Sequence, residues 1–126
     1  YESSLGLVGS EMCIRDSNQV VVDPGLGFAK HARHSAAVLA DLPVLSSLDR
    51  PILVGPSRKS FLESMLGIRS PKNREWGTAG AVAVAAFLGA HIVRVHDVLA
   101  HHDVVRVVDT LRSVSVERQL DLEREC

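Results

Sequence analysis

Three successive cycles of a short apolar run followed by a helical pattern constrain this chain more than any other feature. The runs cover residues 19–22, 51–54 and 91–95, and each stops at glycine, proline or polar residues. Such cycles predict a parallel sheet with right-handed crossover helices. Periodicity alone does not distinguish a piece of a barrel from a doubly wound sheet.

Helices are expected over residues 31–41, 58–66, 75–88 and 102–112, where apolar residues recur every three or four positions. The expected buried faces contain Ala32, Ala36, Leu39 and Ala40 in the first helix, Phe61, Leu62, Met65 and Leu66 in the second, and Val104, Val105, Val108 and Leu111 in the last.

The chain divides into three segments. Residues 1–18 fit no helix or strand period and resemble translated adapter sequence, so we expect them to be foreign to the fold. Residues 19–113 carry the strand–helix pattern, and residues 114–126 are expected to form a charged, frayed tail. The 126 residues suffice for one core but not for a complete (β/α)8 barrel, which usually needs ~250 residues.

Composition excludes several classes of function. The formal net charge of −1 offers no electrostatic basis for binding nucleic acid or an anionic membrane. No apolar run reaches the ~18 residues of a membrane span. Cys13 and Cys126 have neither zinc-site nor CxxC spacing, so a cytoplasmic location is expected.

Polar blocks follow all three runs at the point where each ends. They read DPGLGF from residue 23, GPSRKS from residue 55 and RVHDV from residue 94. In parallel α/β folds, functional side chains gather at the carboxyl ends of the strands. Three blocks in the same register therefore predict one shared pocket.

Asp23 ends the first run. Its carboxylate offers acceptors without a donor, which suits the adjacent N–H groups on the edge of a pterin or guanine. Gly25 and Gly27 allow a sharp turn and a close approach of the backbone to a ligand. Taken alone, Asp-Pro-Gly is common turn chemistry, and a turn-capping Asp23 is then the favoured interpretation.

The second block begins at Gly55 and is not a P-loop, because the spacing between glycines is wrong. Ser57 and Ser60 place hydroxyls near a helix N-terminus, which favours anions. Lys59 opposes the helix dipole there and is interpreted as pointing into a site. A capping Ser57 beside two solvated basic residues is an equally good interpretation.

Arg94 and His96 alternate with valines, so both face the same side of their strand. Arg94 can stack its guanidinium on a heterocycle, and His96 can donate to a phosphate oxygen. Asp97 faces the other way and is expected to be structural. The remaining histidines, His31, His34, His91, His101 and His102, are expected at the surface or in loops.

These blocks, together with the sequence WGTA at residues 76–79, resemble the last three strand-end motifs of the dihydropteroate synthase family. The resemblance implies the C-terminal three βα units of a (β/α)8 TIM barrel, and so an incomplete barrel. The implied reaction condenses 6-hydroxymethyl-7,8-dihydropterin diphosphate with 4-aminobenzoate, which yields 7,8-dihydropteroate and pyrophosphate. The resemblance also implies Mg²⁺, held by strands outside this chain, and a homodimer formed through the last helices.

The resemblance also implies roles for individual residues. Three catalytic side chains would surround the substrate, and further residues would shape its three subsites. The catalytic residues are Lys59, which would donate to the pterin carbonyl and a ring nitrogen, Arg94, which would stack on the pterin, and His96, which would hold the diphosphate together with Ser57. Asp23 would accept from the pterin 2-amino and N3–H groups, and Phe28 and Ser60 would border the aminobenzoate. Gly25, Gly27 and Gly55 would let the backbone approach the ligand. No metal ligand is expected in this chain.

Other interpretations remain open from the sequence. Another pterin-binding barrel, such as a methyltetrahydrofolate methyltransferase, would share the fold and the pterin-recognising carboxylate. A non-catalytic fragment that dimerises through the Ala-rich helix at residues 75–88 is a second alternative. A generic phosphate-binding piece is a third, although the charge of Asp23 would repel phosphate. We expect a polypeptide of these residues alone neither to fold stably nor to catalyse, because a partial barrel exposes strand edges.

Overall fold

The computed structural model describes residues 18–27 and 31–126. Almost all of the predicted leader, and Phe28 of the predicted site, lie outside these residues. In chain order the elements are α2 (Ala32–Ala40), the 3-10 helix η2 (Leu42–Leu48), β1 (Leu53–Val54), η3 (Ser60–Leu62), α3 (Glu63–Leu66), η4 (Pro71–Arg74), α4 (Glu75–Phe87), β2 (Ile92–Val93) and α5 (Val98–Glu125).

A short parallel sheet runs through the centre of the fold. β1 pairs with β2 in a register that places Leu53 opposite Ile92. On the other side of β1, Val22 forms an isolated parallel bridge with Ile52. The Val22 N–H donates to the carbonyl of Pro51 over 2.9 Å, and Leu53 donates to the carbonyl of Val22 over 2.8 Å. All three runs are therefore parallel, as predicted, and they neighbour one another in chain order.

The strands are shorter than the apolar runs suggested. Of the first predicted strand only Val22 pairs, and Gln19 lies in a 3-10 turn. The ladder beyond β2 ends after Arg94, whose N–H donates to the carbonyl of Val54 over 2.9 Å. Apolar, β-branched runs report burial, whereas strand length is set by the neighbours available for hydrogen bonding.

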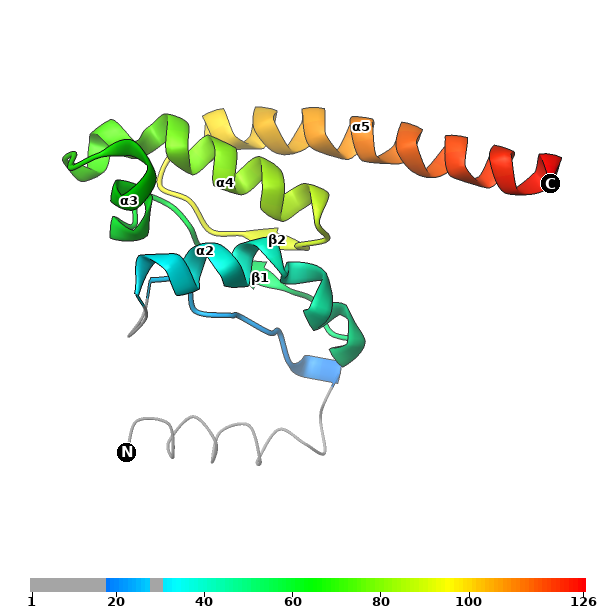
Figure 1. Cartoon of the computed structure of the whole chain (residues 1–126), viewed down its shortest axis with the longest axis horizontal. Helices are drawn as coiled ribbons and strands as arrows, with labels where there is room; N and C mark the ends of the chain where they lie inside the picture. Colours follow the sequence, from blue (N-terminus) through cyan, green and yellow to red (C-terminus); the bar gives the residue numbers. More distant parts are fainter. Residues whose placement is uncertain (1–17, 28–30) are drawn as a thin grey trace.

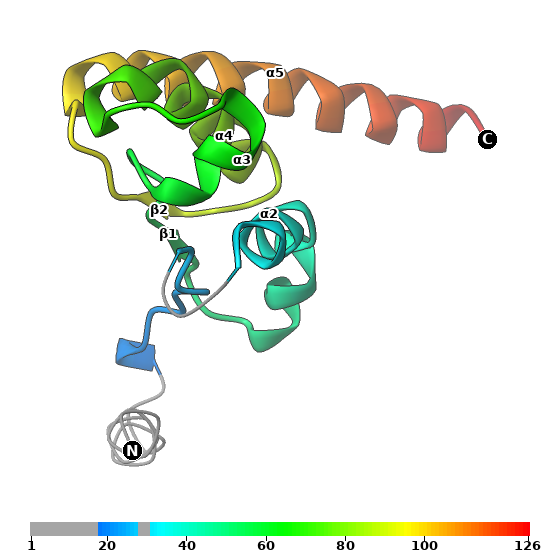
Figure 2. The same ribbon diagram turned by 60° about the vertical axis from the view of Figure 1, so that its left-hand side comes forward.

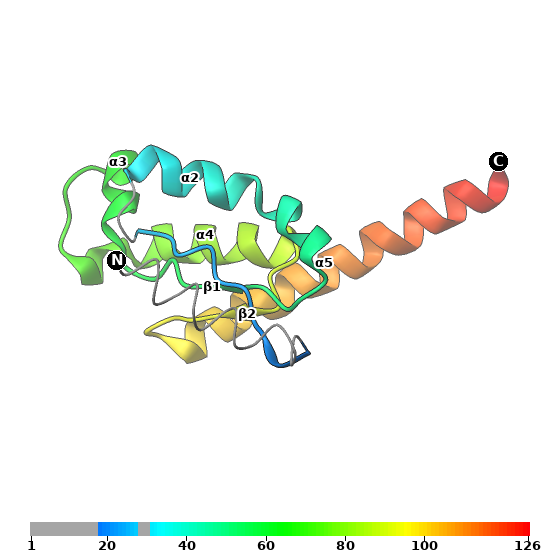
Figure 3. The same cartoon turned by 90° about the horizontal axis from the view of Figure 1, so that it is seen from below.

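The helices cover one side of the strands. α2 and α4 lie side by side, and α5 packs against α4 (Figures 1, 2 and 3). The core lies between the helices and strands, so the predicted periodicity does build one hydrophobic core. Its buried members are Leu26, Leu39, Leu42, Ile52, Val54, Phe61, Leu62, Ala81 and Ala85.

The second predicted helix, 58–66, is replaced by the short helices η3 and α3. Arg58 has a φ of 57°, which stops a helix from beginning there. Phe61 and Leu62 are each 2% exposed, but Met65 is 58% exposed. The expected burial of Met65 is wrong because a single turn buries only part of an apolar stripe.

Two further buried-face predictions are wrong. Ala40 is exposed at the end of α2, and Leu111 on α5 is 60% exposed. Ser35 takes a buried position on α2 instead, because its hydroxyl accepts a hydrogen bond from the Gly27 N–H over 3.0 Å. A pattern of apolar residues does not predict the burial of a serine whose hydroxyl accepts a hydrogen bond from a loop N–H.

Helix α5 is much longer than predicted. The Asp97 carboxylate accepts from the Ala100 N–H over 3.2 Å and so caps its N-terminus, as its expected structural role requires. The helix then continues to Glu125 and projects past the body of the fold (Figure 1). Residues 114–125 are therefore not a frayed tail, because Glu, Arg, Gln and Leu favour helix without burial. Within the described residues, no helix has the length and apolar character that crossing a membrane requires.

Gly77 allows α4 to pack closely on α3. A Cβ atom at Gly77 would lie 2.5 Å from Cδ1 of Leu66, so the end of the Leu66 side chain would have to shift to make room for it. One turn further along α4, a Cβ atom at Gly80 would meet nothing within 4 Å. The two glycines therefore separate the effect of packing from the effect of helix propensity.

In the longer protein expected above, Gly80→Ala should raise the free energy of unfolding by up to about 1 kcal/mol, because Ala favours helix over Gly. Gly77→Ala should raise it by less, because the end of the Leu66 side chain must move. Denaturant unfolding of both variants measures the difference. An equal gain in stability from both substitutions would show that α3 and α4 do not pack at Gly77 as described.

Candidate functional site

A cavity of about 370 Å³ opens at the carboxyl ends of β1 and β2. The second and third polar blocks meet around it, as the register of the strands requires. Parallel pairing of adjacent strands places their carboxyl ends side by side. The cavity is lined by Gly55, Ser57, Lys59, Arg94, Val95 and His96.

A pair of hydrogen bonds joins the two blocks across this cavity. The hydroxyl oxygen of Ser57 lies 2.7 Å from Nδ1 of His96, and it accepts from the His96 main-chain N–H over 3.2 Å. Ser57 is only 7% exposed. When the hydroxyl donates to Nδ1, the neutral imidazole carries its proton on Nε2 and can donate it to a ligand. The alternative interpretation of Ser57 as a helix cap is wrong, because the N-cap of η3 is Lys59 and no side chain caps that helix.

Arg94 lies over Gly55. A Cβ atom at Gly55 would sit 3.4 Å from Nε and 3.5 Å from Nη2 of Arg94, so the guanidinium lies close above the backbone at Gly55. Arg94 and His96 both line the cavity, and Val95 between them lines it too, so the lining does not follow strict strand alternation. Because Arg94 is otherwise exposed, its planar guanidinium is open to a stacked ligand.

Lys59 links the cavity to the first polar block. Its ammonium group donates to the carbonyl of Leu26. Its Cδ atom lies 3.0 Å from where a Cβ atom at Gly27 would be, and Gly27 has a φ of 80°. Glycine at position 27 therefore allows the backbone to pass beside the Lys59 side chain.

Asp23 stands outside the lining of this cavity. The side chain is exposed, and its Oδ1 accepts from the Gly25 N–H over 2.8 Å. This contact is the turn-capping arrangement that the sequence alone favoured. Ser60 is exposed at the start of η3. The ligand-binding roles of Asp23 and Ser60 stay predictions.

Sequence reasoning missed the environment of Arg58. Its left-handed backbone, with φ of 57°, costs a non-glycine residue roughly 1–2 kcal/mol. Its N–H donates to Oγ1 of Thr78 over 3.0 Å, and its carbonyl accepts from Nη1 of Arg74 over 2.8 Å. Its guanidinium forms an ion pair with Glu75. Nothing in the spacing of these residues signals the cluster, because it depends on where α4 packs.

The expected surface position of His101 is also wrong. The side chain is 3% exposed, with Nδ1 2.7 Å from the carbonyl of Asp97 and Nε2 3.9 Å from Oε2 of Glu75. A histidine four residues after a helix cap reaches the cap carbonyl, which is the one sequence signal for this position. His101 therefore connects the start of α5 to the Arg58 cluster.

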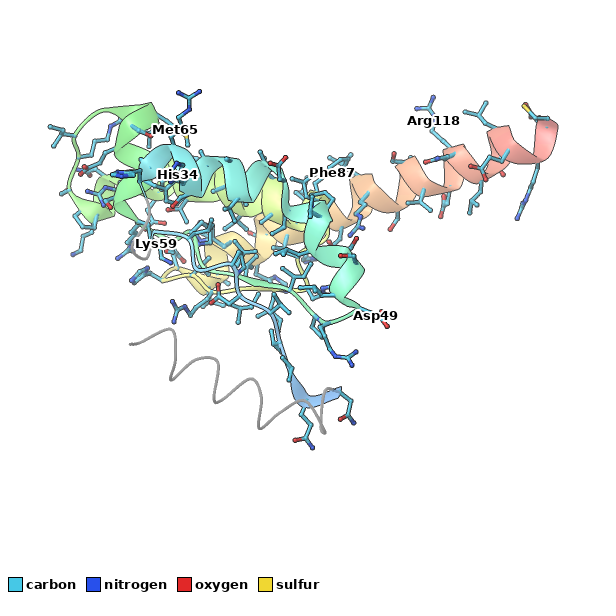
Figure 4. All side chains as sticks on the ribbon, turned by 60° about the horizontal axis from the view of Figure 1, so that its bottom comes forward. His34, Asp49, Lys59, Met65, Phe87 and Arg118 are labelled. Carbon is cyan, nitrogen blue, oxygen red and sulfur yellow. The ribbon has the colours of Figure 1, made fainter. Side chains whose placement is uncertain are left out.

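A larger cavity, of about 590 Å³, lies at the opposite end of the strands, and Asp49, Arg50, His91 and Arg112 are among its lining residues. Figure 4 shows Lys59 near one end of the strands and Asp49 near the other. Because ligands of parallel α/β folds bind at the carboxyl ends of strands, the smaller cavity is the candidate site. The described part of the chain contains no cluster of three or more His, Cys, Asp or Glu side chains suited to a metal ion.

The chain is similar to known sequences. Residues 10–96 match a family described as pterin binding enzyme. The chain is 51% identical over 82 residues to dihydropteroate synthase of Synechocystis sp., covering 65% of this chain and 28% of the relative. It is 49% identical over 90 residues to dihydropteroate synthase of Mycobacterium leprae, covering 68% and 32%. The chain thus spans about three tenths of these relatives.

Solved structures give the same result. Dihydropteroate synthase of Yersinia pestis superposes with a TM-score of 0.78 at 34% identity, over 88% of this chain and 53% of that chain. A dihydropteroate synthase from Coxiella burnetii, in complex with pteroic acid, gives a TM-score of 0.77 at 30% identity, over 86% and 42%. Both likenesses extend over most of this chain.

The two glycines of the first block offer a matched test of the Lys59 contact. In the complete protein, Gly27→Ala and Gly25→Ala should each lower the free energy of unfolding by about 1 kcal/mol, because both positions have a positive φ. Only Gly27→Ala should also weaken pterin binding, since a Cβ atom at Gly25 meets nothing within 4 Å. Fluorescence titration with a pterin, alongside thermal unfolding, measures both effects. Equal pterin affinity in the two variants would count against a role for the Gly27–Lys59 contact.

Proposed function

The chain belongs to the pterin-binding enzyme family, and from this premise we propose that it is part of a dihydropteroate synthase. The observation that carries the proposal is the single cavity that brings Ser57, Lys59, Arg94 and His96 together. Relatives named dihydropteroate synthase, at 51% and 49% identity, support it. A methyltransferase acting on a folate would not need this set of anion-binding groups.

The proposed reaction joins 6-hydroxymethyl-7,8-dihydropterin diphosphate to 4-aminobenzoate. The bond between the pterin methylene carbon and the diphosphate oxygen breaks, and its electron pair leaves with pyrophosphate. The amine nitrogen of aminobenzoate forms the new bond to the methylene carbon and loses a proton. The products are 7,8-dihydropteroate and pyrophosphate, and no side-chain nucleophile is required.

Electrostatic stabilisation of the leaving group is the main task of the cavity in this proposal. Negative charge grows on the diphosphate as the C–O bond breaks, and donors fixed in advance stabilise it most. His96, oriented by Ser57, donates to the diphosphate. Arg94 stacks on the pterin, and Lys59 donates to the pterin carbonyl and a ring nitrogen.

Asp23 is proposed to accept from the pterin 2-amino and N3–H groups. Its bond to the Gly25 N–H uses one acceptor position on Oδ1 and leaves the other oxygen for the ligand. Phe28 and Ser60 are proposed to border the aminobenzoate. Ser60 is exposed, which supports this role because a ligand can reach its side chain.

We further propose that the fold is the C-terminal three βα units of a (β/α)8 barrel. Val22, β1 and β2 neighbour one another in chain order and are all parallel, which is the order in a barrel wall. A reversal of strand order, typical of doubly wound sheets, is absent from the described strands. The superposition on synthase structures supports the same assignment.

Mg²⁺ is implied by the family resemblance, and the residues of this cavity do not suit it. The lining offers two cationic side chains, a hydroxyl and an imidazole, whereas Mg²⁺ prefers carboxylate and water oxygens. No step proposed here depends on the metal, and its ligands are expected elsewhere in the complete protein. A cytoplasmic location is proposed for the same protein.

A homodimer formed along α5 is also proposed. Val107, Leu111 and Val114 follow one another at spacings of four and three residues and are 60%, 60% and 49% exposed. Such a stripe on a projecting helix is apolar surface that a second copy would cover. Ala81 and Ala85 of α4 belong to the core of the chain itself, so we place the proposed interface on α5.

Charge on this stripe should separate the two copies. Leu111→Glu in the complete protein should shift the sedimentation coefficient from dimer to monomer, because a buried unpaired carboxylate is costly. Val44→Glu, at a position 71% exposed on η2, is the matched control and should leave the dimer intact. An unchanged dimer in Leu111→Glu would exclude α5 as the interface.

Activity can be tested in a chimeric enzyme in which residues 19–126 replace the matching segment of the Synechocystis synthase. We expect it to form 7,8-dihydropteroate. Lys59→Ala and Arg94→Ala should each lower kcat/KM by about 100-fold, since each removes a preorganised charge. Lys72→Ala, an exposed position on η4, should change little.

The 126-residue polypeptide by itself should produce no dihydropteroate. Two results would contradict the proposed function: a natively folded chimera without activity, or a chimera whose kcat/KM does not respond to Lys59→Ala. Circular dichroism and thermal unfolding establish the folded state before the assay.

A further inference from the structure

We propose that Arg58 is a positioning residue whose tethered left-handed turn aims Ser57 and Lys59 into the cavity. This inference rests on the proposed function and adds to it a residue that does not touch substrate. Its chain neighbours Ser57 and Lys59 line the cavity, while Arg58 does not. The left-handed backbone at Arg58 reverses the local path, so the two neighbours face the ligand and the Arg58 side chain points to α4.

Three separate contacts hold this turn. The Arg58 N–H donates to Thr78 Oγ1 over 3.0 Å, the Arg58 carbonyl accepts from Arg74 Nη1 over 2.8 Å, and the guanidinium pairs with Glu75. All three partners come from the start of α4 or the residue directly before it. A sparsely populated backbone conformation persists only where its surroundings over-determine it, as they do here.

The partners are themselves held in place. Thr78 is fully buried, and Arg74 is 8% exposed. Arg74 donates through Nη2 to the carbonyl of Arg69 over 2.7 Å and forms an ion pair with Glu63. Behind Glu75 lies the buried imidazole of His101. Thr78, Arg74 and Glu75 therefore have little freedom to move with Arg58 if its backbone conformation changes.

The contacts close a circuit that joins the two polar blocks. His96 contacts Ser57, Arg58 follows Ser57 and pairs with Glu75, and Glu75 faces His101. His101 in turn contacts the carbonyl of Asp97, the residue after His96. The circuit fixes the second block relative to the third through side chains outside the cavity. Loss of one contact should therefore change the geometry between Lys59, Ser57 and His96.

Two substitutions at Arg58 separate the backbone conformation from the side-chain contact. In the chimera, Arg58→Gly and Arg58→Ala both lose the ion pair with Glu75, but only glycine adopts the left-handed turn without a steric cost. We expect kcat/KM for the pterin diphosphate to fall by about 100-fold in Arg58→Ala and by about 10-fold in Arg58→Gly, the scale of a misplacement near 1 Å. Arg58→Lys, which can still pair with Glu75, should recover most of the activity.

Steady-state kinetics distinguish positioning from stability. The KM for pterin diphosphate should rise and kcat should fall in Arg58→Ala at a temperature where the protein is fully folded. Glu75→Ala should mimic it, and the double variant should be no worse than either single one, because both break one contact. Lys72→Ala on η4 is the matched control and should leave both constants unchanged.

The outcomes separate this inference from the proposed function. An active chimera in which Arg58→Ala lowers only the melting temperature would overturn the positioning role and leave the synthase assignment standing. Additive losses in the Arg58→Ala/Glu75→Ala double variant would also overturn it. A folded but inactive chimera would overturn the proposed function, and the role of Arg58 with it.

Discussion

The parallel pairing of β1 with β2 is the constraint on which the rest of the structure depends. Leu53 opposite Ile92 and Val54 opposite Val93 place residues 55–60 beside residues 94–96. A shift of one residue in this register would turn Arg94 and His96 to the other face. The Ser57–His96 contact, the stacking position of Arg94 over Gly55 and the cavity itself all follow from that register.

The packing of α4 supplies the second constraint. Its first turn holds Arg58 in a left-handed conformation through Thr78 and Glu75, and Gly77 lets the same turn approach α3. The residues that shape the cavity from outside thus lie on a helix that never reaches it. Precision in the cavity depends on helix packing as much as on the side chains that face the ligand.

Much of the site could be predicted, and the reason is periodicity. Strand alternation placed Arg94 and His96 on one face, and strand ends identified the blocks that contain Ser57 and Lys59. Arg58 escaped prediction because Thr78, Arg74 and Glu75 are distant from it in sequence. The burial of His101 beside Glu75 likewise depends on the packing of α5 against α4. For Asp23, the same carboxylate can cap a turn or bind a ligand, so its position in the sequence does not distinguish these two roles.

The sequence by itself determined the alternation of strand and helix, the parallel direction, the apolar core and the family, because these depend on local patterns of residue type. Tertiary structure decided the length of each strand, the helical path of residues 114–125, the burial of Ser35 and His101, and the left-handed turn at Arg58. Each of these depends on which neighbour is available to bond or to pack. Which residue becomes that neighbour is settled only when the chain folds.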